Sequence, residues 1–172
     1  NSHFLSNTLE SIAWKARATG SYDAAKMASL LGDFFRLSSS RKDMFATVAE
    51  EIEHIKAYVE IQKIRYGDQF DFVLEVEDDG KIKNNYTIKI LLQPLVENAI
   101  MHAVDSSDRC VTIKVRIYNK EGMMHFEISD DGPGMSKESL EKLNHELEGS
   151  GNRNRGIGLR NIKERISLYF AV

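Results

Sequence analysis

The chain has 172 residues, of which 42% are hydrophobic and 28% charged, and its formal net charge is −3. This length is enough for a domain with a sizeable core plus a helical appendage, and the mild acidity gives no reason to expect a nucleic-acid partner. Cys110 is the single cysteine, which excludes an internal disulfide and a thiolate metal site. No apolar run reaches the ~20 residues that a transmembrane helix needs. We therefore expect any membrane attachment to come through an upstream segment absent from this sequence.

The first forty residues predict two amphipathic helices, over 3–19 and 22–38, separated by Gly20-Ser21. Their apolar positions fall on a shared stripe that a lone hairpin cannot bury. Two copies joined in a four-helix bundle would bury this stripe, so we expect residues 1–40 to form a dimerising segment of a homodimer. Packing of the hairpin against the rest of the same chain is the alternative.

The remainder predicts a linker helix over 41–66 and a mixed α/β domain over 67–172. Thr47-x-x-Glu50 has the form of a capping box at the start of the linker helix, and Gly67 stops that helix after Tyr66. Alternating apolar residues predict strands over 70–76, 111–117 and 124–128, the last two joined as a hairpin. Further helices are predicted over 88–104, 136–147 and 157–168.

Three segments of the second half carry residues suited to a nucleotide. The first is Glu97-Asn98 in the helix over 88–104. An amide oxygen such as that of Asn98 is a ligand that Mg²⁺ accepts beside phosphate oxygens. A local hydrogen bond or cap is the alternative role for this residue.

The second segment runs from Asp130 to Met135, directly after a predicted strand. A carboxylate at a strand end can accept a hydrogen bond from the exocyclic amine of adenine. Gly132 and Gly134 would let the backbone approach a ring closely. We expect the Asp130 side chain at a buried rim, and a simple Asp-Gly turn is the alternative.

The third segment, residues 149–161, holds glycines and arginines ahead of a helix. Free N–H groups at a helix N-terminus bind phosphate. The segment is neither a Rossmann fingerprint nor a P-loop, since no strand precedes it and no Gly-Lys-Ser/Thr is present. A flexible linker is the alternative.

Together, "LLQPLVENAIMHA", "ISDDGPGM" and "GIGLRNIKERI" resemble the N, G1 and G2 boxes of the ATPase fold shared by histidine kinases, gyrase, Hsp90 and MutL. The sequences of these three segments are most similar to those of the LytS/YesM class of sensor histidine kinases. The resemblance implies an α+β chain, with a Bergerat-type α/β sandwich that lacks its C-terminal strands and binds ATP. It assigns Mg²⁺ to Asn98, the adenine amine to Asp130 and a mobile lid to residues 135–155. It also implies a catalytic role for Glu97. The other residues placed at the nucleotide are His102, Gly132, Gly134, Met135, Arg155, Gly156, Gly158 and Leu159.

The segment "HFLSNTLESI" resembles the phosphoacceptor segment of the same class, with His3 as the nucleophile. At ~100° per residue, His3 lies roughly opposite the apolar stripe of its helix, with Asn7 close to it at i+4. A nearby amide can fix the tautomer of an imidazole. Residues 50–68 resemble the linker helix and first strand of the class.

The resemblance implies Mg-ATP-dependent autophosphorylation on His3, transfer to an aspartate of a response-regulator receiver domain, and a position on the cytoplasmic face of the membrane. Met101 stands where the class usually has a lysine, and the chain stops at Val172 where the class continues into further strands. These departures keep two alternatives open. One is a nucleotide-binding but non-catalytic dimeric signalling or scaffold module, and the other is a clamp-type ATPase of the same superfamily.

Overall fold

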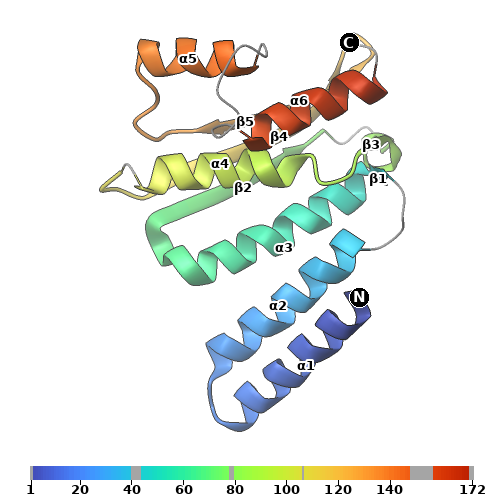
Figure 1. Ribbon diagram of the computed structural model, residues 1–172, viewed down its shortest axis with the longest axis vertical. Coiled ribbons are helices and arrows are strands. Elements are labelled where there is room, and N and C mark those ends of the chain that lie inside the picture. The colour runs from blue at the N-terminus through green and yellow to red at the C-terminus, as the bar shows by residue number, and fades with distance from the viewer. Residues whose placement is uncertain (1, 40–43, 78–79, 106, 148–156, 171–172) are drawn as a thin grey trace.

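The computed structural model describes residues 2–39, 44–77, 80–105, 107–147 and 157–170. A helical hairpin, made of α1 (Ser2–Ala18) and α2 (Tyr22–Ser39), projects from a mixed α/β part (Figure 1). Gly20 adopts a left-handed φ of +78° in the turn between the two helices, a conformation that glycine accepts without strain. The predicted α+β class and both predicted helices are confirmed.

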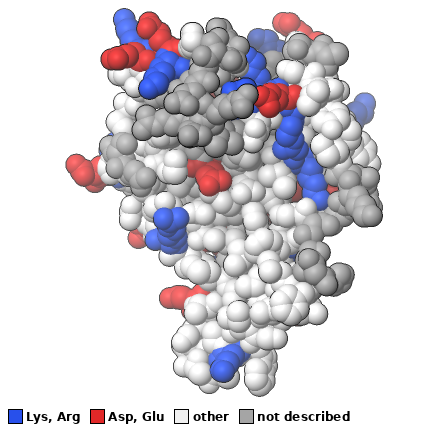
Figure 2. All heavy atoms as spheres, in the orientation of Figure 1, with Lys and Arg blue, Asp and Glu red and all other residues white. Residues whose placement is uncertain are grey.

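Small side chains line the contact between the two helices of the hairpin. Ala13, Ala25 and Ala28 are buried between α1 and α2, so the two helices approach closely. Larger apolar side chains, among them Leu5 and Ile12, stay at the surface. Figure 2 shows few charged side chains over the hairpin on the face in view. The hairpin therefore keeps an apolar surface that the rest of the chain does not cover.

Helix α3 (Val48–Tyr66) starts at the predicted capping box. The Glu50 amide lies 3.2 Å from Thr47 Oγ1, and the Thr47 amide lies 2.8 Å from Glu50 Oε2. Gly67 caps the other end. Val48, Ile52, Ile55, Tyr58 and Val59 belong to the main hydrophobic core, so α3 packs as part of the α/β layer. The division of the chain at residue 67 stays a prediction.

A three-stranded sheet forms the other layer. The central strand β4 (Val111–Lys120) pairs in parallel with β2 (Phe70–Val76) and antiparallel with β5 (Met123–Asp130). Side chains at alternate positions of β4, from Val111 to Ile117, are almost fully buried under α3 and α4. Glu121 and Gly122 both have positive φ in the β4–β5 turn, which is typical of a two-residue hairpin turn and confirms the predicted hairpin.

A second, two-stranded sheet was not predicted. β1 (Phe45–Thr47) pairs antiparallel with β3 (Tyr86–Ile88), and Thr87 and Ile88 are buried there. The helix predicted from residue 88 therefore begins later, as α4 (Leu92–Asp105). Strands of three residues are too short to show a period in the sequence, and Ile90 turns the chain with a φ of +58°.

The remaining elements are two 3₁₀ turns, η1 (Gly67–Gln69) and η2 (Ile82–Asn84), and the predicted helices α5 (Lys137–Leu147) and α6 (Ile157–Tyr169). Helix α6 packs beside α4, and α5 lies next to α6 (Figure 1). Within the described ranges, none of the helices combines the length and the apolar character needed to span a membrane.

Candidate functional site

Helix α4 is the element on which the predicted nucleotide residues meet. Val96, Ala99, Ile100 and Ala103 form its buried stripe. Residues three and four apart share a side of a helix, so Asn98 and His102 lie together on another side of α4. Asn98 is half-buried there, whereas His102 and Glu97 are exposed.

The turn after β5 lies against this helix. Asp130 ends β5 opposite Ile113, on the face of the sheet that the helices cover. Its Oδ1 accepts a hydrogen bond of 3.0 Å from the Gly132 amide. A Cβ added at Gly132 would lie 3.0 Å from Cβ of Ala103, so glycine fits here where a larger residue would collide. The Asp130 side chain itself is exposed, which corrects the expectation of a buried rim, because Asp130 is the last residue of β5 and lies at the open end of the sheet.

The two adjacent aspartates differ in their surroundings. Asp131 Oδ1 accepts a hydrogen bond of 2.7 Å from the Thr112 amide, and Oδ2 pairs with Arg109 at 3.3 Å. The Thr112 N–H, followed by Arg109, lowers the pKa of the Asp131 carboxyl. Asp131 therefore anchors the turn to β4. Asp130 Oδ2 accepts no hydrogen bond from the residues that the structure describes, so it can face a ligand.

The start of α6 also touches α4. A Cβ added at Gly158 would lie 3.7 Å from Cβ of Pro94, one turn before Asn98. Leu159 is half-buried beside it. Arg155 and Gly156 lie outside the described residues. Gly134 has a left-handed φ of +72°, and Met135 after it is exposed. The structure thus brings the G1 and G2 segments against α4, the helix that carries the N segment.

A buried carboxylate that the sequence analysis missed holds the N-terminus of α4. Glu51 of α3 is 2% exposed, and its two oxygens accept hydrogen bonds from the amides of Ile90 (2.5 Å), Leu91 (2.8 Å) and Leu92 (3.2 Å). The first amides of a helix lack partners within the helix, and a negative charge favours this end. Burial raises the pKa of the Glu51 carboxyl, and these N–H groups together with Arg165 oppose that rise.

The sequence does hold a signal for this residue. Glu51 lies three residues after Val48 and four before Ile55, on the apolar stripe of α3. A charged residue on such a stripe indicates a buried polar contact, because an unpaired buried charge is costly.

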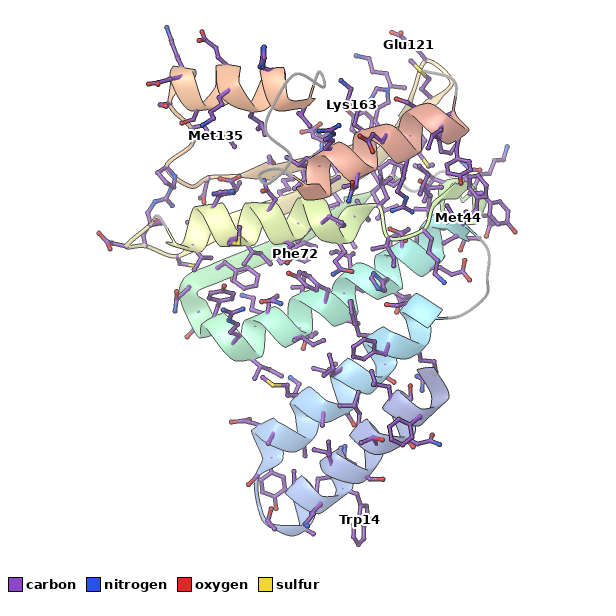
Figure 3. The ribbon with its side chains drawn as sticks, in the orientation of Figure 1. Trp14, Met44, Phe72, Glu121, Met135 and Lys163 are labelled. Atoms are coloured by element: carbon purple, nitrogen blue, oxygen red, sulfur yellow. The ribbon has the colours of Figure 1, made fainter. Side chains whose placement is uncertain are left out.

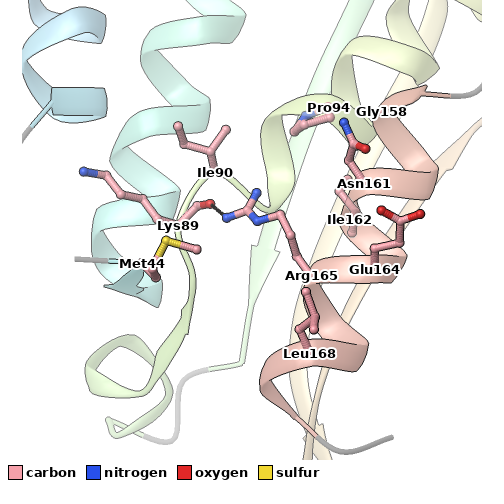
Figure 4. A pocket seen from close by; sticks show the side chains of 10 residues that line it. All are labelled: Met44, Lys89, Ile90, Pro94, Gly158, Asn161, Ile162, Glu164, Arg165 and Leu168. Atoms are coloured by element: carbon pink, nitrogen blue, oxygen red, sulfur yellow. Dashed lines mark hydrogen bonds between the residues drawn. The ribbon is translucent and has the colours of Figure 1, made fainter. Parts of the chain in front are cut away.

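A pocket of about 480 Å³ lies between α6 and residues 89–94 (Figure 4). Arg165 crosses it and donates a hydrogen bond to the Lys89 carbonyl. Gly158 is the predicted nucleotide residue that lines this pocket, whereas Asp130 and Gly132 do not. The pocket therefore lies beside the first half of α4, whereas the turn after β5 lies beside the second half of α4.

His3 and Asn7 lie elsewhere in the molecule. Both belong to α1, which packs on α2, and α2 packs on α3. Helices α2 and α3 thus separate α1 from α4 (Figure 1). The structure does not bring His3 and Asn7 together with Asn98 or Asp130.

Comparison with known proteins agrees with this arrangement. The profile of the Histidine kinase family matches residues 1–70, and that of the Histidine kinase-, DNA gyrase B-, and HSP90-like ATPase family matches residues 83–170, about half of the chain. A solved structure of a bacterial phosphotransferase superposes with a TM-score of 0.51, covering 97% of this chain and 78% of that one. At 10% identity it supports the fold alone.

Three relatives match nearly the whole chain. Sensor histidine kinase YesM of Bacillus subtilis (strain 168) is 38% identical, with 99% of this chain and 28% of YesM aligned. Sensor protein LytS of Bacillus anthracis is 30% identical, with 99% and 28% aligned. Sensor protein kinase HptS of Staphylococcus aureus (strain NCTC 8325 / PS 47) is 27% identical, with 98% and 32% aligned. The chain thus spans less than a third of the length of these relatives. It belongs to the histidine kinase-, DNA gyrase B-, and HSP90-like ATPase family, and the segment that precedes the ATPase match is similar to the Histidine kinase family.

Proposed function

We propose that this chain is the kinase core of a two-component sensor, which binds Mg-ATP, phosphorylates itself on His3 and passes the phosphoryl group to an aspartate of a receiver domain. The observation that carries the proposal is the contact of α4 with both glycine-bearing segments, at Ala103 and at Pro94. A chain that carries a family phosphoacceptor segment ahead of such a site has both parts that the reaction needs.

The residues around α4 fit ATP. At Gly132 the backbone approaches α4 with no space for a Cβ, and the free Asp130 Oδ2 suits the adenine amine. Asn98 would hold Mg²⁺ together with phosphate oxygens, since the described residues contain no cluster of three His, Cys, Asp or Glu that could hold the ion alone. His102 shares the side of α4 with Asn98. The other groups proposed around the nucleotide are Gly134, Met135, Arg155, Gly156, Gly158 and Leu159.

The transfer itself requires mainly positioning and charge neutralisation, which bound Mg²⁺ supplies. In the proposed reaction the imidazole of His3 attacks the γ-phosphorus as the neutral form and ADP leaves, and Asn7, four residues along the same helix, would fix the tautomer. We propose that Glu97, exposed beside Asn98, takes part at the reacting end of the nucleotide.

We also propose a homodimer through the hairpin. Leu5 and Ile12 lie seven residues apart on one side of α1, and both are exposed. A second copy that packs on this side would complete a four-helix bundle. The core would then lie on the cytoplasmic face of the membrane, attached through a segment upstream of this sequence.

Incubation with γ-labelled ATP tests the proposal. The label should be acid-labile and base-stable, as phosphohistidine is. His3→Gln should abolish labelling and leave ATP affinity unchanged. The matched control is His125→Gln, which removes a histidine stacked on Tyr118 of the sheet and should label like the wild type.

Two outcomes would contradict this function. Labelling of His3→Gln at the wild-type rate would show that another residue accepts the phosphoryl group. ATP binding by the wild type without any labelling would instead favour the non-catalytic signalling module.

A further inference from the structure

His54 of α3 is buried where the hairpin meets the α/β part. Its side chain is 4% exposed, and its ring stacks on Phe34 of α2 with a centroid distance of 4.6 Å. The Nε2 atom of His54 lies 2.8 Å from Oγ of Ser38, which also belongs to α2. This is a polar contact between α2 and α3 at a largely buried position.

The hydrogen bonds fix the tautomer of this histidine. Ser38 Oγ donates its one hydrogen to the Phe34 carbonyl at 2.7 Å. The hydroxyl must therefore accept from Nε2–H, which leaves Nδ1 without a hydrogen. Nδ1 is buried and has no partner among the described residues. A second proton there would be a buried charge without an acceptor, which is costly.

An ion pair between α2 and α3 is weaker. Lys26 and Glu60 are 3.5 Å apart, but more than half of each side chain is exposed, and exposed ion pairs contribute little. The His54–Ser38 bond lies three residues along α3 from Glu51, which holds α4. One helix thus carries buried polar contacts to the hairpin and to the nucleotide helix.

We propose that the His54–Ser38 hydrogen bond is a pH-dependent tie that sets the orientation of the α1–α2 hairpin relative to the ATPase domain. The tie holds with neutral His54. Protonation of Nδ1 leaves the Nε2–H donor in place but puts an unpaired charge in this buried site, so the protonated ring leaves its contact with Ser38. The neighbours that face the ring are Phe34 and Ser38 from α2 and the cation of Lys89 from the turn after β3. Tyr58 of α3 packs on the same Phe34 ring.

The pH range of the tie follows from these surroundings. Burial, and secondarily Lys89, lowers the pKa of His54 below the ordinary histidine value of 6.5. The tie is therefore complete above that value and is lost as the pH falls through the lowered pKa. The pH range from 7.5 to 5 includes the ordinary histidine value, and variants at His54 separate its contribution from that of other groups that titrate in this range.

The chain contains a fluorescence pair for measuring this orientation. Trp14 on α1 is the single tryptophan and is exposed near the end of the hairpin (Figure 3), and Cys110 is the single, exposed cysteine in the ATPase domain. A dye on Cys110 accepts energy from Trp14. Labelled chain is diluted into excess unlabelled Trp14→Phe chain, so that most of the transfer measured is within one chain.

We expect the transfer efficiency of the wild type to change between pH 7.5 and 5. His54→Phe keeps an aromatic ring on Phe34 and should remove the change. Ser38→Ala should show at pH 7.5 the efficiency that the wild type reaches in acid. His125→Phe, a matched control on the sheet, should follow the wild-type curve, and circular dichroism confirms that each variant is folded.

A flat wild-type curve, or a His54→Phe variant that titrates like the wild type, would overturn the proposal. A consequence for catalysis rests on the proposed function. Because the tie holds α1 two helices away from α4, Ser38→Ala should raise His3 labelling about fivefold, the shift that loss of one ordinary hydrogen bond allows, with ATP affinity unchanged. Unchanged labelling beside altered energy transfer would reject this consequence alone.

Discussion

The contact between Gly132 and α4 gives a quantitative prediction for Gly132→Ala. The added Cβ would lie 2.9 Å from Asp130 Oδ1, 3.0 Å from Ala103 Cβ and 3.1 Å from Ala103 Cα. Ordinary carbon–carbon contacts are ~3.5–4.0 Å, so the turn must move away from α4 by roughly half an ångström or more. Overpacking of this kind costs about 1–3 kcal/mol of unfolding free energy. In a protein of this size, each kcal/mol lowers Tm by about 2–4 °C.

The same movement should weaken ATP binding. It displaces Asp130 from α4, and a shift of this size in a binding group is expected to cost roughly tenfold in affinity. Isothermal titration calorimetry measures the affinity, and urea unfolding followed by circular dichroism measures the stability. Gly122→Ala is the matched control. Gly122 has a φ of +80° and nothing near its Cβ position, so this variant should lose about 1–2 kcal/mol of stability and no ATP affinity.

A second variant separates the steric cause from a general loss of structure. Ala103→Gly removes one of the colliding atoms, and in a helix this exchange costs about 1 kcal/mol. Combined with Gly132→Ala, it should restore part of the ATP affinity that Gly132→Ala loses. The double variant should nevertheless remain less stable than the wild type, so affinity and stability are separated. Wild-type affinity in Gly132→Ala, or no coupling between positions 103 and 132, would refute the reasoning.

Three further predictions concern other parts of the molecule. Asp130→Asn should weaken ATP binding roughly ten- to hundredfold by calorimetry, because a charge-assisted hydrogen bond contributes about 1.5–3 kcal/mol, and unchanged affinity would remove Asp130 from the adenine site. Glu51→Ala should lower the unfolding free energy by about 3–5 kcal/mol, since three amides lose a buried charged acceptor, and a loss below about 1 kcal/mol in urea unfolding would contradict this role. Ile12→Asp should convert the proposed dimer into a monomer by light scattering, and a wild type that is already monomeric at tens of micromolar would argue against the dimer.

The sequence predicted the long elements well because each has a strong local signal. The capping box from Thr47 to Glu50 defines the start of α3, and the alternation from Val111 to Ile117 defines a strand. The same signals cannot show which strands become neighbours. The parallel pairing of β2 with β4 depends on the packing of α3 and α4 across the sheet, which is a property of the whole chain.

The segments that carry the candidate residues could be identified from the sequence, and the contacts that hold these segments in place could not. Asn98, Asp130 and Gly132 stand in recognisable motifs, and the structure places their segments against one helix. Glu51 and His54 were not found as functional candidates, because acidic residues and histidines are common on exposed helix faces. Their spacing along the apolar stripe of α3 was the available signal, and only the packing shows what each side chain contacts.

The two buried contacts of α3 bear on how a signal could reach the nucleotide. Helix α3 has 19 residues and is packed in the core, so it offers a rigid connection along which a displacement of the hairpin at Ser38 would reach Glu51. Glu51 holds three consecutive amides at the start of α4, and α4 carries Asn98. Loss of a contact at either end would therefore change the position of α1 relative to α4 without altering a residue proposed to touch ATP. Under the proposed function this coupling would matter, because the arrangement of the two parts would decide whether His3 meets the phosphoryl group.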